Sequence, residues 1–191
     1  MTRLVTWLAR ATAVLGGLVL CALIVLTTLS IIGRSLNKLF HTGIAQSAFG
    51  GLSNWAINAG VGEINGSYEL LEAGVAFSIF AFFPVCQLYS GHATVDVFTS
   101  ALPPRALATL RAFWEIVLAA TIVFLTFRLA DGMMRYVNNG ETTLFLQFPV
   151  WWSYAASVVA ATVASITAVY CARVAEVALG RAVMPNDHIG E

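Results

Sequence analysis

The sequence predicts an all-α integral membrane protein with four transmembrane helices, folded as a single membrane domain over residues 1–191. Its composition is the first indication, because the chain is 59% hydrophobic and only 10% charged, whereas soluble domains have about 45–50% apolar and about 25% charged residues. So few charges cannot supply the charged exterior that keeps a soluble protein from associating. Long uncharged segments are the second indication, since backbone that faces lipid must satisfy its own hydrogen bonds and therefore forms helices.

Four segments are long enough to cross a hydrocarbon core of about 30 Å, which requires about 20 helical residues. The predicted spans cover residues 11–33, 70–89, 112–127 and 150–172, with approximate boundaries. The first follows Arg10 and resembles a secretion signal, but it exceeds the roughly 7–15 apolar residues of a signal peptide. We therefore expect an uncleaved first span.

The third span has the shortest uncharged centre, and its flanks must contribute to the crossing. Pro103 and Pro104 are typical of a helix start, and Asn138, Asn139 and Gly140 supply a stop. A helix between these signals is longer than the membrane is thick. It should tilt, kink or protrude.

An interfacial amphipathic segment is predicted between spans one and two, at about residues 36–60. It contains few charges and could be mistaken for a fifth span, but its glycines and amides weaken a lipid-exposed helix. Leu52, Trp55, Ala56 and Ala59 recur at the spacing of one helix face. We favour a helix that lies along the membrane surface.

Several functional classes find no support in the sequence. Ten basic residues balance ten acidic ones, so no net charge attracts nucleic acid. Cys21, Cys86 and Cys171 lack the C-x-x-C spacing of redox or zinc sites. The three histidines lie outside the spans, which leaves no axial ligands for haem within a bundle. The sequence thus predicts no enzyme and no catalytic, cofactor or metal site.

The most notable charges are Glu69 and Glu72, which share one helix face at the start of span two. Arg34 and Lys38 follow span one at the same level, and pairing of the two acids with Arg34 would hold spans one and two together. The alternative is proton or sodium coupling, since acids within membranes often mark ion paths. We favour the structural pairing because both acids lie near a span end.

Span four carries a ridge of small residues, among them Ala156, Ala160 and Ala164 at intervals of four. Small residues let helices approach closely in lipid, so this face should contact protein, either in the same bundle or in a partner. Trp151 and Trp152 lie at the start of the span, where indoles anchor helices at the membrane surface.

Several short sequence motifs, taken in order along the chain, resemble those of the small membrane subunit of tripartite ATP-independent periplasmic (TRAP) transporters, the DctQ type. Arg34 closes span one, and the segment 67–70 resembles the family's aromatic-x-Glu entry to span two. The segment from Gly91 and His92 to Asp96 resembles a Gly-His-x-x-Val-Asp turn, and Leu102-Pro103 resembles the Leu-Pro before span three. Residues 140–142 and 148–151, which include Pro149, resemble the entry to span four.

Two features depart from the family pattern. The basic residue often found between His and Val of the turn is replaced by Ala93 and Thr94, and the insert at residues 39–65 is long. We expect Asp96 to brace the connection after Gly91 and His92, although an ordinary solvated turn would contain the same residue types.

The resemblance implies a non-catalytic scaffold subunit in the bacterial inner membrane. Its implied partners are a large permease subunit with a sodium-coupled elevator motion, a periplasmic binding protein that delivers an organic acid, and membrane lipids. The distribution of basic residues favours cytoplasmic termini. Two alternatives stay open: a small proton-coupled exporter that uses Glu72, and a redox or assembly subunit that holds haem.

Overall fold

A computed structural model describes residues 2–40, 66–89, 91 and 103–183. Within these residues the chain forms four helices: α1 (Thr2–Phe40), α3 (Ser67–Leu88), α4 (Pro104–Asn139) and α5 (Trp151–Val183). Each is long and apolar enough to cross a membrane, which confirms the predicted all-α membrane fold. The described residues contain no strand, and a single isolated bridge joins Thr142 to Pro149.

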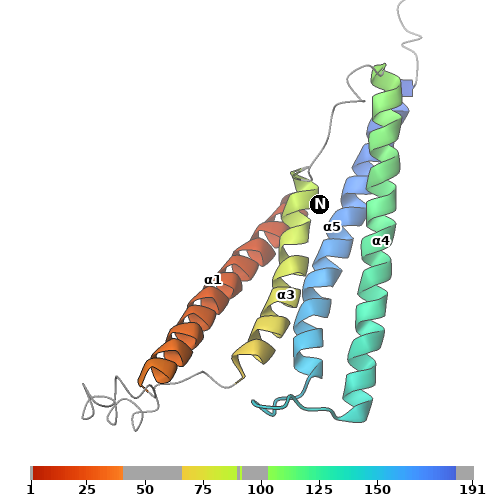
Figure 1. Ribbon diagram of the computed structural model, residues 1–191. Helices are drawn as coiled ribbons and strands as arrows, with labels where there is room; N and C mark the ends of the chain where they lie inside the picture. The colour runs from red at the N-terminus through yellow and green to blue at the C-terminus, as the bar shows by residue number, and fades with distance from the viewer. Residues whose placement is uncertain (1, 41–65, 90, 92–102, 184–191) are drawn as a thin grey trace, which may run out of the picture.

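The helices stand in a row rather than in a closed bundle (Figure 1). In this row α1 packs on α3, α3 on α5 and α5 on α4, with a smaller contact between α1 and α5. In the most apolar stretch of 18 residues in α5, 39% of the residues are buried. The corresponding stretch of each of the other three helices has 17% of its residues buried. This difference agrees with the contacts of α5, which packs on all three other helices. Most residues of the apolar stretches are not buried within the chain, and they are left for lipid or for another protein.

The helices extend beyond the predicted spans. α1 is continuous to Phe40, so residues 36–40, which we assigned to the interfacial segment, belong to the first helix. The rest of that segment lies outside the described residues. At about 1.5 Å per residue, α1 is longer than the hydrocarbon core is thick.

α4 has the ends that the sequence predicted. It begins at Pro104, directly after Pro103 in an extended conformation, and ends before Gly140, whose φ of 64° closes the helix in the left-handed region. The first part of α4 and the last part of α5 extend well past the end of α3 (Figure 1). The surplus length therefore protrudes alongside α5.

α1 and α3 approach closely through small residues. A Cβ atom added at Gly16 would lie 2.9 Å from the Cβ of Ala81, and one at Gly74 would lie 2.7 Å from Cδ1 of Leu23. The buried Ser78 hydroxyl donates to the carbonyls of Gly74, at 2.7 Å, and of Gly16, at 3.3 Å. We missed the sequence signal for this contact, which is that Gly74, Ser78 and Ala81 are small residues on one helix face.

The small-residue ridge of α5 contacts protein within the same chain. Ala160, Ala164 and Ala168 have no exposed surface, and a hydroxyl pair at 2.8 Å joins Thr126 of α4 to Ser165 of α5. Ala160 and Ala164 therefore pack inside the molecule. Ala156 differs, because it is exposed.

Candidate functional site

The connection between α4 and α5 folds into a short hairpin over residues 141–150. The amide of Thr143 donates to the carbonyl of Phe148 at 2.9 Å, and the amide of Val150 donates to that of Glu141 at 3.1 Å. Between these bonds the chain turns at Leu144, and the turn reaches across α5 toward the start of α3 (Figure 1). The start of α3 thus lies against a segment more than seventy residues away in sequence.

Glu69 joins the two segments. One oxygen of its carboxylate accepts the amide of Phe145 at 2.8 Å, and the other accepts the amide of Leu146 at 3.0 Å. The carboxylate thereby satisfies two turn amides, and hydrogen bonds to a charged acceptor are among the stronger ones in proteins. Gly66 is part of the same contact, because a Cβ atom at this position would lie 2.6 Å from Cγ of Leu146.

We predicted that Glu69 pairs with Arg34, but in the structure its carboxylate binds the two turn amides instead. The Nη1 atom of Arg34 lies 3.5 Å from the hydroxyl of Tyr68, on the side of α3 that faces α1. Glu69 and Glu72 lie on the side that faces α4, α5 and the hairpin. The two acids therefore share a helix face, and this face is turned away from the guanidinium.

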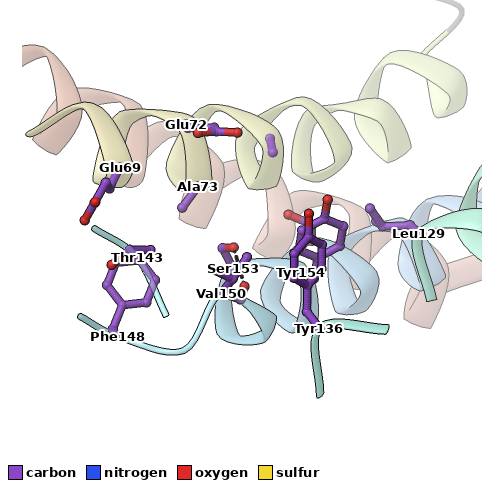
Figure 2. A pocket seen from close by; sticks show the side chains of 12 residues that line it. Glu69, Glu72, Ala73, Leu129, Tyr136, Thr143, Phe148, Val150, Ser153 and Tyr154 are labelled. Carbon is purple, nitrogen blue, oxygen red and sulfur yellow. Dashed lines mark hydrogen bonds between the residues drawn. The ribbon is translucent and has the colours of Figure 1, made fainter. Parts of the chain in front are cut away.

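A cavity of about 380 Å³ lies between α3, α4, α5 and the hairpin. Figure 2 shows Glu69, Glu72 and Ala73 of α3 on one side, and Tyr136, Ser153 and Tyr154 on the other. The rings of Tyr136 and Tyr154 lie 4.9 Å apart. Since Glu72 lies in the second turn of α3, the polar part of this cavity is at the end of the helix and not at its middle.

Arginine and tyrosine meet at both ends of the α1–α3 pair. At the end opposite Arg34, the guanidinium of Arg10 donates to the hydroxyl of Tyr89 from Nη2 at 2.7 Å and from Nε at 3.2 Å. Arg34 thus contacts a tyrosine in the first turn of α3, and Arg10 contacts the tyrosine that directly follows the helix. We missed both tyrosines. The available signal was their position, since one lies in the first turn of α3 and the other directly follows the last turn.

The other charge pairs differ from those expected from spacing alone. Glu115 accepts a hydrogen bond from the buried Gln87 of α3, although Arg111 lies four residues before it on α4. Asp131 forms an ion pair with Arg128 at 3.8 Å, although Arg135 lies four residues after it. Both helical spacings are allowed for an ion pair, so the sequence did not decide between them.

The remaining candidates lie at helix ends. Lys38 is exposed near the end of α1, and Gly91 follows α3 with its amide bound to the carbonyl of Cys86 at 2.8 Å.

Trp151 and Trp152 begin α5 with their rings edge to face and partly exposed. Pro149 precedes them and accepts the amide of Trp152 at 3.1 Å. His92 and Asp96 lie outside the described residues.

The part of the chain that the structure describes holds no group of three side chains able to bind a metal ion. No curated protein and no solved structure matches the chain significantly. One family model does match, over residues 59–180, and its description is "Tripartite ATP-independent periplasmic transporters, DctQ component". The match covers more than half of the chain. The protein belongs to the DctQ family.

DctQ membership agrees with the four helices that can span a membrane, and together they make the chain a multi-pass membrane component of a transporter. DctQ is a family of transporter components and not of enzymes. The matched region contains α3, α4, most of α5 and the hairpin, and therefore both Glu69 and the turn that it binds. α1, with Arg10 and Arg34, precedes it.

Proposed function

We propose that this DctQ protein is the non-catalytic scaffold subunit of a sodium-coupled TRAP transporter. It supports a large elevator-type permease subunit, while a periplasmic binding protein delivers an organic acid. The observation that carries the proposal is membership of a family of tripartite transporter components. The row of helices supports it, since fewer than half of the residues in the most apolar stretch of each helix are buried within the chain.

The distribution of charge also favours a scaffold. The segments 11–33, 73–89, 116–127 and 151–172 contain no Asp, Glu, Lys or Arg. Glu69 and Glu72 lie in the first two turns of α3, and Glu115 is bound to Gln87 in its last turn. Charges within membranes usually mark the path of an ion or substrate, and here the charges that contact α3 lie near its ends.

The proposed location is the bacterial inner membrane, with both termini in the cytoplasm. In this orientation the hairpin and the start of α3 face the periplasm, and the protruding ends of α4 and α5 face the cytoplasm. The basic residues near the span ends support this orientation, because cytoplasmic loops carry the excess of Arg and Lys.

Reconstitution tests the proposal directly. The chain would be expressed alone and together with a large TRAP permease subunit from the same genome, and both preparations would be inserted into liposomes with a sodium gradient. We expect the two proteins to copurify, and we expect uptake of an organic acid only when both membrane subunits and the binding protein are present. Sodium-driven uptake by the isolated chain would contradict a scaffold role.

The cavity beside Glu72 favours a second candidate, a small proton-coupled exporter. In that case Glu72→Gln would abolish transport by the isolated chain in a pH gradient. Under the scaffold proposal the isolated chain transports nothing, and Glu72→Gln leaves uptake by the complete complex intact.

A further inference from the structure

The tip of the α4–α5 hairpin exposes three consecutive apolar side chains. Leu144 is 82% exposed, Phe145 is 63% exposed and Leu146 is 43% exposed. A turn in water normally contains small and polar residues, since they satisfy turn geometry and solvation together. A run of exposed apolar residues at such a position indicates contact with another apolar phase.

Several backbone amides of the hairpin already have hydrogen-bond acceptors within the protein, as an environment poor in water requires. The amides of Phe145 and Leu146 are bound by the Glu69 carboxylate, and those of Thr143 and Val150 by carbonyls within the hairpin. A backbone N–H that enters lipid without an acceptor costs several kcal/mol. Glu69 removes this obstacle for two of the tip amides, while the three side chains stay exposed.

The tip also lies at the level where the membrane surface is expected. It contacts Gly66 and Glu69 at the start of α3, and α5 begins directly after the hairpin with Trp151 and Trp152. Tyr68 of α3 is 61% exposed at this same end. Exposed Trp and Tyr side chains at the ends of spans are typical of the boundary between headgroups and acyl chains.

We propose that Leu144, Phe145 and Leu146 form an apolar wedge that inserts into the lipid headgroup and acyl-chain boundary of the adjacent leaflet. The exposed Tyr68, Trp151 and Trp152 lie at the same end of the spans and favour lipid over a protein partner, because such side chains are typical of the membrane boundary. The wedge anchors the hairpin and, through Glu69, the start of α3. This inference needs only the membrane location and not the scaffold role.

Site-directed spin labelling tests the wedge. In the full chain with Cys21, Cys86 and Cys171 replaced by alanine, a single cysteine would be introduced as Leu144→Cys or, separately, Phe145→Cys. The matched control is Glu141→Cys, an exposed position at the base of the same hairpin. Each nitroxide would be measured in phosphatidylethanolamine–phosphatidylglycerol vesicles for collision with oxygen, which concentrates in lipid, and with a water-soluble nickel complex.

We expect the ratio of oxygen to nickel collisions to be several-fold higher at 144 and 145 than at 141. A nickel accessibility at 144 and 145 equal to that at 141 would overturn the wedge, because the tip would then lie in water. Low accessibility to both reagents would also overturn it, because the tip would then be covered by protein. The measurement would be repeated with the permease subunit present. Because the wedge can persist when no complex forms, the wedge and the scaffold role can fail separately.

Discussion

At the scale of single residues, two glycines adopt the same unusual conformation for different reasons. Gly66 and Gly140 have φ values of 82° and 64° and flank α3 and α4. A side chain at Gly140 would meet nothing within 4 Å, whereas one at Gly66 would collide with Leu146. Gly140 therefore serves the end of a helix, and Gly66 also makes room for the hairpin.

This difference predicts unequal effects of alanine at the two positions. Gly140→Ala should destabilise the protein by about 1–2 kcal/mol, the cost of a left-handed L-residue. Gly66→Ala should cost more, because it adds a collision with Cγ of Leu146. Thermal unfolding in detergent, followed by circular dichroism, would compare the two variants. Equal losses would show that Leu146 moves aside freely.

Glu69 should control the local stability of the hairpin tip. Glu69→Ala removes the acceptor of two amides, and Glu69→Gln leaves one carbonyl oxygen, so amide exchange at Phe145 and Leu146 should be fastest in the alanine variant and intermediate in the glutamine variant. Hydrogen–deuterium exchange of peptides covering 141–150 measures this order. Glu72→Ala is the matched control, and accelerated exchange in it as well would assign the effect to the cavity.

At the scale of helices, close packing through small residues decides which faces meet. The contact of α1 with α3 depends on Gly16, whereas Gly17 faces open space. Gly16→Val should separate the helices and destabilise the protein by about 1–3 kcal/mol, as expected for overpacking. Gly17→Val should have little effect. Comparable unfolding temperatures for the two variants would contradict this helix contact.

α5 permits the same comparison with alanines. Ala164 is completely buried and Ala156 is exposed, so Ala164→Leu should destabilise the isolated chain by about 1–3 kcal/mol and Ala156→Leu should not. A stable Ala164→Leu chain would contradict the packing of α5. Because Ala156 is uncovered, copurification of the Ala156→Leu chain with the permease subunit shows separately whether this position contacts a partner.

At the scale of the whole molecule, the protruding ends of α4 and α5 and the hairpin lie on opposite sides of the spans. With cytoplasmic termini, a cysteine at Thr109 should react with a membrane-impermeant maleimide only after cells are permeabilised, and one at Glu141 should react in intact cells. Both positions are exposed, and the background would lack the three native cysteines. The reverse pattern would invert the proposed orientation.

The sequence by itself determined the features that depend on local chemistry. Apolar length defined four membrane helices, the pair Pro103–Pro104 and Gly140 defined the ends of α4, and the spacing of Ala160 and Ala164 identified a packing face. Each follows from the properties of neighbouring residues in one segment. Beyond Phe40, the predicted interfacial segment lies outside the described residues.

Only the tertiary structure decided how the segments meet. It arranged the helices in the row α1, α3, α5, α4, turned Ala156 outward, and gave Glu69 two backbone amides as partners. Opposite charges in the sequence do not indicate this contact, because every residue except proline carries an amide donor and the sequence does not mark which ones the turn leaves unpaired. The partner of a buried or capping charge is set by geometry between distant segments, and local pattern does not encode that geometry.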